Sequence, residues 1–243
     1  MMTDSYEGFS ERYDWMSRDD PVRSAFFRRL FAKSNVSKVL DCACGTGTDL
    51  LMFHAMNLET YGSDLSESML AEARKKIANT DINLKIVDFS NLTDNYNEKF
   101  DAVVCLNNSI NEVLKDSETL SGLHSMRSVL HAGGLLVFDQ GQTDASMRNP
   151  PRFAPIVNNK NFSRLFKMDY STDILTVNVF DFIHTDDELD FKHHSVRIRI
   201  RLQDSWSEIL HEVGFAKVDF YGDWNFTLYD KESSSRLIAV VRK

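Results

Sequence analysis

The sequence predicts an α/β fold in which helices cover a doubly wound, mainly parallel sheet. Two observations lead to this prediction. Short buried-strand segments alternate with helical ones between residues 21 and 142, which is the pattern of parallel strands joined by helices. Beyond residue 142 the alternation stops, and two long segments with a period of two follow, as expected for antiparallel strands. At 243 residues the chain fits one large domain, so we expect a single domain over 1–243 with an insertion over 145–200.

The first half of the chain is predicted to begin with a helix over 21–34. Asp20 is a good N-cap, Pro21 suits the first helical position, and apolar side chains recur at helical spacing after it. Buried strands are then expected within 37–43, 58–64, 83–90, 100–109 and 135–141. Helices are expected between them, over 48–57, 66–79 and 120–134, the last ending at Gly133.

The second half begins with residues 145–165, which contain prolines and asparagines and which we interpret as a crossing segment. Residues 174–184 and 190–202 alternate with a period of two. They predict an antiparallel pair of strands joined through Asp186 to Leu189. The remaining expected elements are a helix over 205–215 with Gly214 as its C-cap, and strands within 216–224 and 235–243.

The composition disfavours several classes of function. A formal net charge of −8 repels phosphate backbones, so we expect no nucleic-acid partner. Three cysteines do not make a disulfide framework, and the first residues have no basic and apolar regions of a secretory signal. No apolar run approaches the ~20 residues of a membrane helix. We therefore expect a cytoplasmic protein without a membrane partner.

The segment "VLDCACGTGTDL", residues 39–50, has three interpretations. A metal site is disfavoured because Cys42 and Cys44 are one residue apart and no second pair exists, so we expect no metal. A strand ending in a ligand-free glycine turn is the second interpretation. The third is a nucleotide-binding loop, favoured because a helix and a second strand ending at Asp64 follow the glycines. Leu50 stands where the dinucleotide motif has a third small residue, so a nucleoside without phosphates fits better than NAD.

Four segments together resemble the class I S-adenosylmethionine-dependent methyltransferases: "VLDCACGTGTDL", "GSDLSESMLAEARKK", "FDAVVCLNNSINEV" and "LHAGGLLVFD". Within that class the chain is most similar to the glycine/sarcosine N-methyltransferase branch and the related amino-sugar N-methyltransferases. The resemblance covers nearly the whole chain and is loose over 145–235. It implies a Rossmann-like, doubly wound seven-stranded sheet with an antiparallel last strand, and an antiparallel β cap inserted after strand five. It also implies S-adenosylmethionine as cofactor and S-adenosylhomocysteine as product.

The resemblance further implies a set of cofactor-binding residues. Asp41 and the loop of Ala43, Cys44, Gly45 and Gly47 would hold the methionine amino group and the sugar, and Asp64 would hold the ribose hydroxyls. The adenine would meet Leu65, Met69, Asp88 and Phe89, and the sulfonium would lie above Leu106, Asn107 and Asn108. Near the N-terminus, Tyr13 and Trp15 would close over cofactor and substrate, and Arg18 or Arg23 would meet the cofactor carboxylate.

The expected reaction is methyl transfer to a small-molecule amine. An amine must be neutral when it attacks, so a nearby proton acceptor helps. Glu112 stands where the relatives carry a histidine, and we predict Glu112, Asn108 and Tyr13 as the catalytic residues. Glu112 could instead be a solvated acid at a helix start. Two further alternatives stay open, an O-methyltransferase of a small acid or hydroxyl compound and a cofactor-binding module without activity.

The identity of the acceptor depends on a second departure from the relatives. Gly141 stands just after strand five, where the glycine enzyme has an arginine that grips the substrate carboxylate. Glycine is therefore a doubtful substrate. Replacement cations could come from Arg148 or Arg152, or from Arg197, Arg199 and Arg201, which alternation places on one face of a strand. A solvated edge is the alternative explanation for these three charges. The sequence leaves the oligomeric state open.

Overall fold

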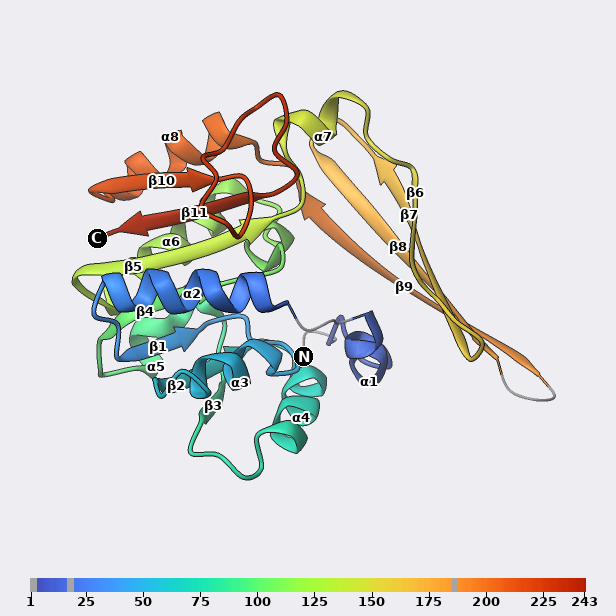
Figure 1. Cartoon of the computed structure of the whole chain (residues 1–243), viewed down its shortest axis with the longest axis horizontal. Helices are drawn as coiled ribbons and strands as arrows, with labels where there is room; N and C mark the ends of the chain where they lie inside the picture. The colour runs from blue at the N-terminus through green and yellow to red at the C-terminus, as the bar shows by residue number, and fades with distance from the viewer. Residues whose placement is uncertain (1–3, 17–19, 185–187) are drawn as a thin grey trace.

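The computed structural model of the chain describes residues 4–16, 20–184 and 188–243. Its strands form a seven-stranded sheet, which makes the body of the molecule, and a separate four-stranded sheet that projects from it (Figure 1). Within the described residues, no helix combines the length and the apolar character needed to cross a membrane.

The seven-stranded sheet has the strand order β10-β11-β5-β4-β1-β2-β3. Its strands are β1 (Lys38–Asp41), β2 (Glu59–Asp64), β3 (Asn83–Ile86), β4 (Phe100–Cys105), β5 (Leu130–Gln140), β10 (Lys217–Tyr221) and β11 (Leu237–Arg242). β1 to β5 pair in parallel, whereas β11 is antiparallel to both β5 and β10. The order reverses between β1 and β4, which is where open α/β sheets bind ligands. The predicted seven-stranded, doubly wound sheet with an antiparallel last strand is confirmed.

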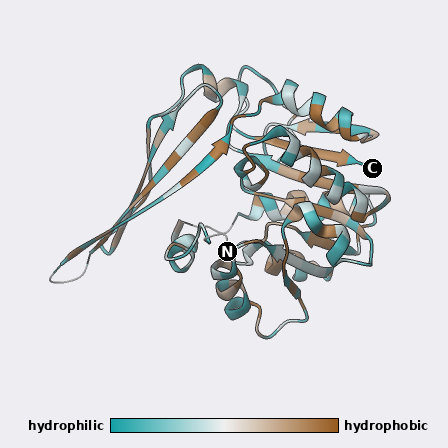
Figure 2. Cartoon of the chain, turned by 180° about the vertical axis from the view of Figure 1, so that it is seen from behind, coloured by the Kyte–Doolittle hydropathy of each residue, from teal (hydrophilic) through white to brown (hydrophobic). Residues whose placement is uncertain are grey.

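Helices cover both faces of this sheet, as the sequence predicts. They are α2 (Pro21–Lys33), α3 (Thr48–His54), α4 (Glu67–Lys76), α5 (Leu92–Asn95), α6 (Asp116–Val129) and α8 (Gln203–Val213). Adjacent strand residues point to opposite faces, and both Val103 and Val104 are fully buried. Val103 packs in the core under α6 and α8, and Val104 in the core under α2. Figure 2 shows the hydrophobic residues concentrated in these strands and the hydrophilic ones on the outer helix faces.

The predicted helix ends are confirmed in two places and wrong in a third. The Asp20 side chain accepts from the backbone N–H of Val22 at 3.1 Å and caps α2, and Gly214 ends α8 with a φ of +85°. Gly133, however, does not end a helix. α6 already ends at Val129, because Leu130 is extended and pairs with β4 as the first residue of β5. Gly133 lies inside β5 with a φ of +76°.

The four-stranded sheet, called the cap below, consists of β6 (Phe153–Asn158), β7 (Phe162–Tyr170), β8 (Ile174–His184) and β9 (Leu189–Arg199). Each pair of adjacent strands in this sheet is antiparallel. The interpretation of 145–165 as a crossing segment is wrong, because α7 (Asp144–Arg148), β6 and the start of β7 lie there. Pro155 is compatible with β6 because β6 is an edge strand. The predicted turn residue Asp186 lies outside the described residues.

An N-terminal segment, residues 4–16, lies between the body and the cap (Figure 1). It contains α1 (Ser10–Tyr13) and the 3₁₀ turn η1 (Asp14–Met16). Two further 3₁₀ turns, η2 (Phe89–Asn91) and η3 (Ser109–Glu112), follow β3 and β4. These short elements surround the carboxyl ends of the parallel strands.

Candidate active site

A cavity of about 930 Å³ lies at the carboxyl ends of β1, β2, β3 and β4 and is closed on one side by the N-terminal segment. This volume is at the upper end of the range for small-molecule sites. Thirteen of the predicted site residues line it: Tyr13, Arg23, Ala43, Cys44, Gly45, Asp64, Leu65, Met69, Asp88, Phe89, Asn107, Asn108 and Glu112. They come from six separate stretches of the chain, which the sheet topology brings together.

The glycine loop after β1 forms the floor of the cavity. Gly45 and Gly47 have φ values of +51° and +80°, a region that other residues rarely adopt. A Cβ at Gly47 would also lie 3.1 Å from the Cβ of Ala73, so α3 and α4 approach closely only because this residue is glycine. The nearby Cys42 and Cys44 are free, buried thiols.

Asp64 ends β2 beside this loop. Its Oδ2 accepts from the backbone N–H of Gly45 at 2.8 Å, and its Oδ1 accepts from that of Ser66 at 2.9 Å. Burial raises the pKa of Asp64, and these backbone donors oppose the shift. A carboxylate oxygen can accept two hydrogen bonds, so each oxygen retains capacity for a hydroxyl of a ligand.

Four predicted residues do not line the cavity. Asp41 is buried beneath the loop, where it accepts from the backbone N–H of Ala43 at 3.2 Å. Leu106 is buried in the core under α2, and Gly47 is the N-cap of α3. Trp15 packs edge-on against Phe162 of the cap, with 4.8 Å between ring centroids. Arg18, the alternative to Arg23, lies outside the described residues.

One end of the cavity contains an ion pair that the sequence analysis missed in part. Arg23 Nη2 and Asp49 Oδ2 are 2.7 Å apart, and Asn107 Nδ2 donates to the same oxygen at 3.5 Å. Burial raises the pKa of Asp49, and the guanidinium of Arg23 opposes this. The Nε of Arg23 is buried and has no hydrogen-bond partner among the described residues. The sequence signal for Asp49 was its position in the first turn of α3, directly after the glycine loop.

The loop after β4 forms the wall of the cavity next to this ion pair. Asn107 and Asn108 both have positive φ, at +59° and +68°, which asparagine tolerates better than most residues. The backbone N–H of Asn107 donates to Asp139 Oδ1 at 2.9 Å. Asn108 Oδ1 accepts from the backbone N–H of Gly141 at 3.0 Å. The ends of β4 and β5 are thereby tied together beneath η3.

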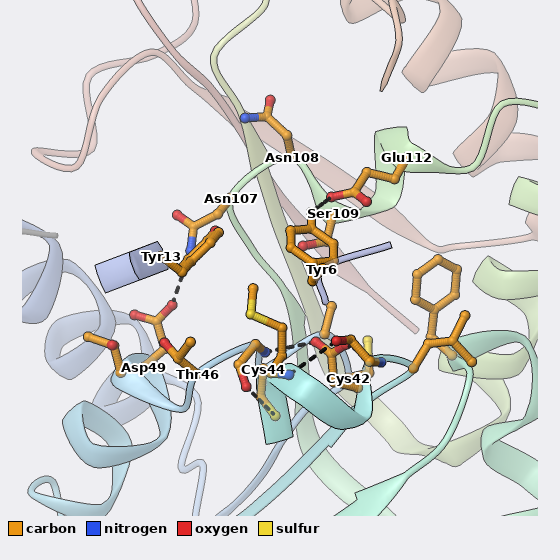
Figure 3. A pocket seen from close by; sticks show the side chains of 18 of the residues that line it. Tyr6, Tyr13, Cys42, Cys44, Thr46, Asp49, Asn107, Asn108, Ser109 and Glu112 are labelled. Carbon is orange, nitrogen blue, oxygen red and sulfur yellow. Dashed lines mark hydrogen bonds between the residues drawn. The ribbon is translucent and has the colours of Figure 1, made fainter. Parts of the chain in front are cut away.

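Glu112, the last residue of η3, lies further along this loop and points into the cavity (Figure 3). The hydroxyl of Tyr6 donates to its Oε1 at 2.6 Å. Burial raises the pKa of Glu112 to about 7, although the Tyr6 hydrogen bond lowers it. Glu112 is therefore not a solvated acid on the surface, and its carboxyl group changes charge near neutral pH.

Tyr6 was missed by the sequence analysis. Its ring lies edge-to-face with that of Tyr13, with 6.2 Å between centroids, and both line the cavity. Burial raises the pKa of both phenols well above the ordinary value, so both remain protonated hydrogen-bond donors. The sequence signal for Tyr6 was the spacing of aromatic residues in "YEGFSERYDW". Tyr13 and Trp15 were predicted from the second half of this segment, and Tyr6 stands at its start.

The N-terminal segment is tied to the body through two aspartates. Asp14 accepts from the hydroxyl of Thr46 at 2.7 Å and forms an ion pair with Lys76. Asp4 accepts from the hydroxyl of Ser66 at 2.8 Å and from the backbone N–H of Ser68 at 2.9 Å. Both contacts lie on the rim of the cavity, so the segment covers it.

The candidate replacement cations do not lie in the cavity. Arg148 pairs with Glu232 at the surface, and neither Arg152 nor Arg197 lines the cavity. The expected row of three arginines on one strand face is wrong, because β9 ends at Arg199. Arg201 is buried, where it donates to the carbonyl of Val113 and pairs with Asp116.

A different arginine, Arg236, does line the cavity. It immediately precedes β11, and it pairs with the fully buried Asp139 at the end of β5. Because β11 is antiparallel to β5, its first residue lies at the same edge of the sheet as the site. No local motif surrounds Arg236, so the sequence alone did not indicate it.

Comparisons with known proteins agree with this geometry. Residues 39–134 match the family described as Methyltransferase domain. The glycine/sarcosine N-methyltransferase of Aphanothece halophytica is 28% identical over 248 residues, covering 98% of this chain and 89% of that protein. An S-adenosylmethionine-dependent methyltransferase from Clostridium acetobutylicum superposes with a TM-score of 0.82 at 20% identity, covering 98% of both chains. A Micromonospora echinaspora amino pentose methyltransferase, solved with S-adenosylmethionine bound, gives a TM-score of 0.77 at 17% identity, covering 100% of this chain and 98% of that one.

The chain is a class I S-adenosylmethionine-dependent methyltransferase, and S-adenosylmethionine is its cofactor. The cavity suits this molecule. Asp64 has acceptor capacity for two hydroxyls, and Leu65, Met69 and Phe89 offer apolar surface for a base. At the opposite end, the orphaned Nε of Arg23 can donate to a carboxylate.

Proposed function

We propose that this methyltransferase transfers the methyl group to the nitrogen of a small-molecule amine, with Glu112 as the proton acceptor. The observation that carries the proposal is the pair of Tyr6 and Glu112, joined at 2.6 Å, in which the pKa of the carboxyl group is raised to about 7 by burial. A general acid or base works best when its pKa is near the working pH. An ammonium group arriving at this carboxylate can therefore be converted to the free amine that attacks.

The bound cofactor supplies a methyl group on a positively charged sulfur, which an in-line lone pair can displace. The protein's part is to hold that lone pair on axis and to exclude water. Tyr6 engages Oε1 of Glu112, which leaves Oε2 to accept the proton of the amine. Tyr13 lies across the cavity from this carboxylate (Figure 3), and Asn108 lines the cavity on the same loop as Glu112. Both would orient the acceptor.

The charges of the cavity support an acceptor without a carboxylate. Its acidic lining residues are Asp4, Asp14, Asp20, Asp49, Asp64, Glu67, Asp88 and Glu112. Its basic lining residues, Arg23 and Arg236, are each already paired with an aspartate. A surplus of acids attracts cations and repels anions. The amine we propose therefore differs from glycine and sarcosine, the amino acids for which the Aphanothece halophytica relative is named.

We also propose that residues 145–200 act as a cap over the acceptor within one domain of residues 1–243. The support is that β9 packs against η3, which carries Glu112, and that His194 of β9 lies 5.4 Å from the ring of Tyr6. A cytoplasmic location is supported by the three free thiols, which suit a reducing compartment.

The test is to incubate the enzyme with methyl-labelled S-adenosylmethionine and a fractionated metabolite extract, and to identify the labelled product. A matched panel would contain an amine, the alcohol of the same skeleton, and the amino acid formed by adding a carboxylate. We expect label on the nitrogen of the amine and much less transfer to the amino acid. Label found only on oxygen would make the enzyme an O-methyltransferase and overturn the proposal.

A further inference from the structure

A buried charge cluster joins the cap to the N-terminal segment. Arg164 of β7 and Asp181 of β8 face each other in register, with Nε–Oδ1 and Nη2–Oδ2 distances of 2.7 and 2.8 Å. Arg12 of α1 adds a third contact, its Nε lying 3.1 Å from Oδ2 of Asp181. The side chains of Arg164 and Asp181 are 0% and 1% exposed. None of the three residues lines the cavity.

The guanidinium of Arg164 also reaches the backbone of the N-terminal segment. Its Nη2 donates to the carbonyl oxygen of Arg12 at 3.0 Å, and its Nη1 to that of Tyr13 at 3.4 Å. These are carbonyls of the last turn of α1, where the regular helical hydrogen bonds run out; the carbonyl of Arg12 also accepts from the backbone N–H of the C-cap residue Asp14. The same guanidinium lies over the ring of Phe9, 4.9 Å from its centroid. Arg164 thus contacts α1 through charge, hydrogen bonds and an aromatic face.

This arrangement matters because α1 is too short to be stable alone. It has four residues, far fewer than an isolated helix needs. Tyr13, which lines the cavity, is therefore held in place by the contacts that the segment makes with the rest of the molecule, called its anchors below. Asp4, Tyr6 and Asp14 hold it to the body. The cluster around Arg164 holds it to the cap, on the opposite side (Figure 1).

We propose that Arg164 and Asp181 are positioning residues that hold the N-terminal segment closed over the cofactor cavity by binding the carboxyl end of α1. The pair touches neither cofactor nor acceptor, and it acts through Tyr13. The proposal goes beyond the choice of acceptor, and its test needs no acceptor, so it can fail or succeed independently of N-methylation.

The decisive variant is the double substitution Arg164→Met with Asp181→Leu. Replacing both members of a buried ion pair with apolar residues of similar size is often tolerated, whereas removing one leaves an unpaired buried charge. The double variant therefore keeps the cap but removes the two hydrogen bonds from Arg164 to α1 and the contact of Arg12 with Asp181. A matched control is Lys167→Met with Asp169→Leu, which removes an exposed ion pair from the same strand, β7.

The readouts are hydrogen exchange along the chain and the release rate of S-adenosylhomocysteine. We expect residues 4–16 of the double variant to exchange about tenfold faster, because two hydrogen bonds of ordinary strength are lost, while 39–140 is unchanged. S-adenosylhomocysteine should also leave faster, because Tyr13 and Asp14 line its cavity. Exchange of 4–16 and release rates equal to those of the control would overturn the proposal.

A second variant decides the question if the double variant does not fold. Arg12→Met leaves the pair of Arg164 and Asp181 intact and removes only the contact made by α1 itself. We expect a smaller acceleration of exchange, confined to residues 4–16, and again faster release of S-adenosylhomocysteine. No change in either quantity would show that the contact between Arg12 and Asp181 does not hold the segment, and would overturn the part of the proposal that assigns Asp181 to it.

Discussion

At the scale of single residues, Glu112 shows how burial converts an ordinary carboxylate into a group that titrates near neutrality. Burial raises its pKa from 4.5 to about 7 despite the hydrogen bond from Tyr6. The folded protein therefore holds a proton between these pH values that the unfolded chain has lost. The stability that this proton provides is fully present below the unfolded pKa and is lost as the pH rises through about 7.

This linkage gives a prediction for Glu112→Gln. The variant cannot ionise but can still accept from Tyr6, so its stability relative to the parent should rise between pH 4.5 and 7. The gain should approach about 3 kcal/mol and then level off. Chemical denaturation across this pH range measures it. Glu118→Gln is the control, because Glu118 is an exposed partner of Lys115. A difference that does not change with pH would contradict the burial of the Glu112 carboxyl group.

The same substitution tests catalysis once the labelled acceptor is identified. If Glu112 takes the amine proton, Glu112→Gln should lower the single-turnover rate by ~10²–10⁴ and leave cofactor affinity nearly unchanged. The parent rate should rise with pH through about 7, as the carboxyl group ionises. A variant rate within about threefold of the parent, with the same pH dependence, would show that Glu112 is not the acceptor.

Tyr6→Phe is the companion variant for this experiment. In the parent protein, the hydroxyl of Tyr6 donates to the ionised carboxylate and so lowers the pKa of Glu112. Removing it should move the midpoint of the pH–rate profile upward rather than abolish activity. A profile that stays in place would mean that the hydrogen bond does not control the charge of Glu112.

The residues that the sequence indicated share one property: they lie in local patterns. Gly45 and Asp64 stand in a strand–loop–helix–strand unit whose geometry follows from the chain itself. Tyr6 and Arg236 come from opposite ends of the chain and meet the site only through tertiary packing. Trp15 lies close to Tyr13 in the sequence, but its side chain packs against Phe162 of the cap instead of lining the cavity.

At the scale of elements, the parallel strands were predictable and half of the cap was not. β8 and β9 alternate cleanly, whereas β6 contains Pro155 and Asn158 and its register against β7 shifts near Pro155. The strand structure of β6 depends on pairing with β7, and that of β7 on pairing with β8, which local periodicity does not reveal. In the same way, α6 ends four residues before Gly133 because pairing of Leu130 with β4 overrides the glycine signal.

The cap gives a prediction at this scale. Its strands pack against the body mainly through the N-terminal segment and η3 (Figure 1). We therefore expect amides in 145–200 to exchange more readily than those in 39–140, and to slow when S-adenosylhomocysteine and the acceptor are both bound. Hydrogen exchange with mass spectrometry measures both effects. Uniform protection of the two regions without a response to ligand would exclude a cap that closes on the substrate.

At the scale of the whole molecule, the cavity is lined by the body and the N-terminal segment, and that segment in turn contacts the cap. Ligand that binds only the folded state stabilises the entire fold by mass action. Asp64 contributes both to ligand affinity and to the stability of the ligand-free fold. It faces the cavity, and it also accepts from the backbone N–H groups of Gly45 and Ser66. Asp64→Ala would therefore weaken the apo fold too, and Asp64→Asn, which keeps one acceptor, separates ligand affinity from folding better.

The whole-molecule prediction concerns the choice of ligand. S-adenosylhomocysteine at 100 times its dissociation constant should stabilise the protein by about 2.7 kcal/mol, a rise in melting temperature of roughly 5–10 °C. NAD should give no such rise, because the buried Leu50 stands where a dinucleotide fold needs a small residue. In Asp64→Asn the rise at the same ligand concentration should shrink, because a charged acceptor facing the cavity is lost. Differential scanning calorimetry measures all three. A melting shift with NAD and none with S-adenosylhomocysteine would contradict the assignment of Asp64 to ribose binding and of the cavity to this cofactor.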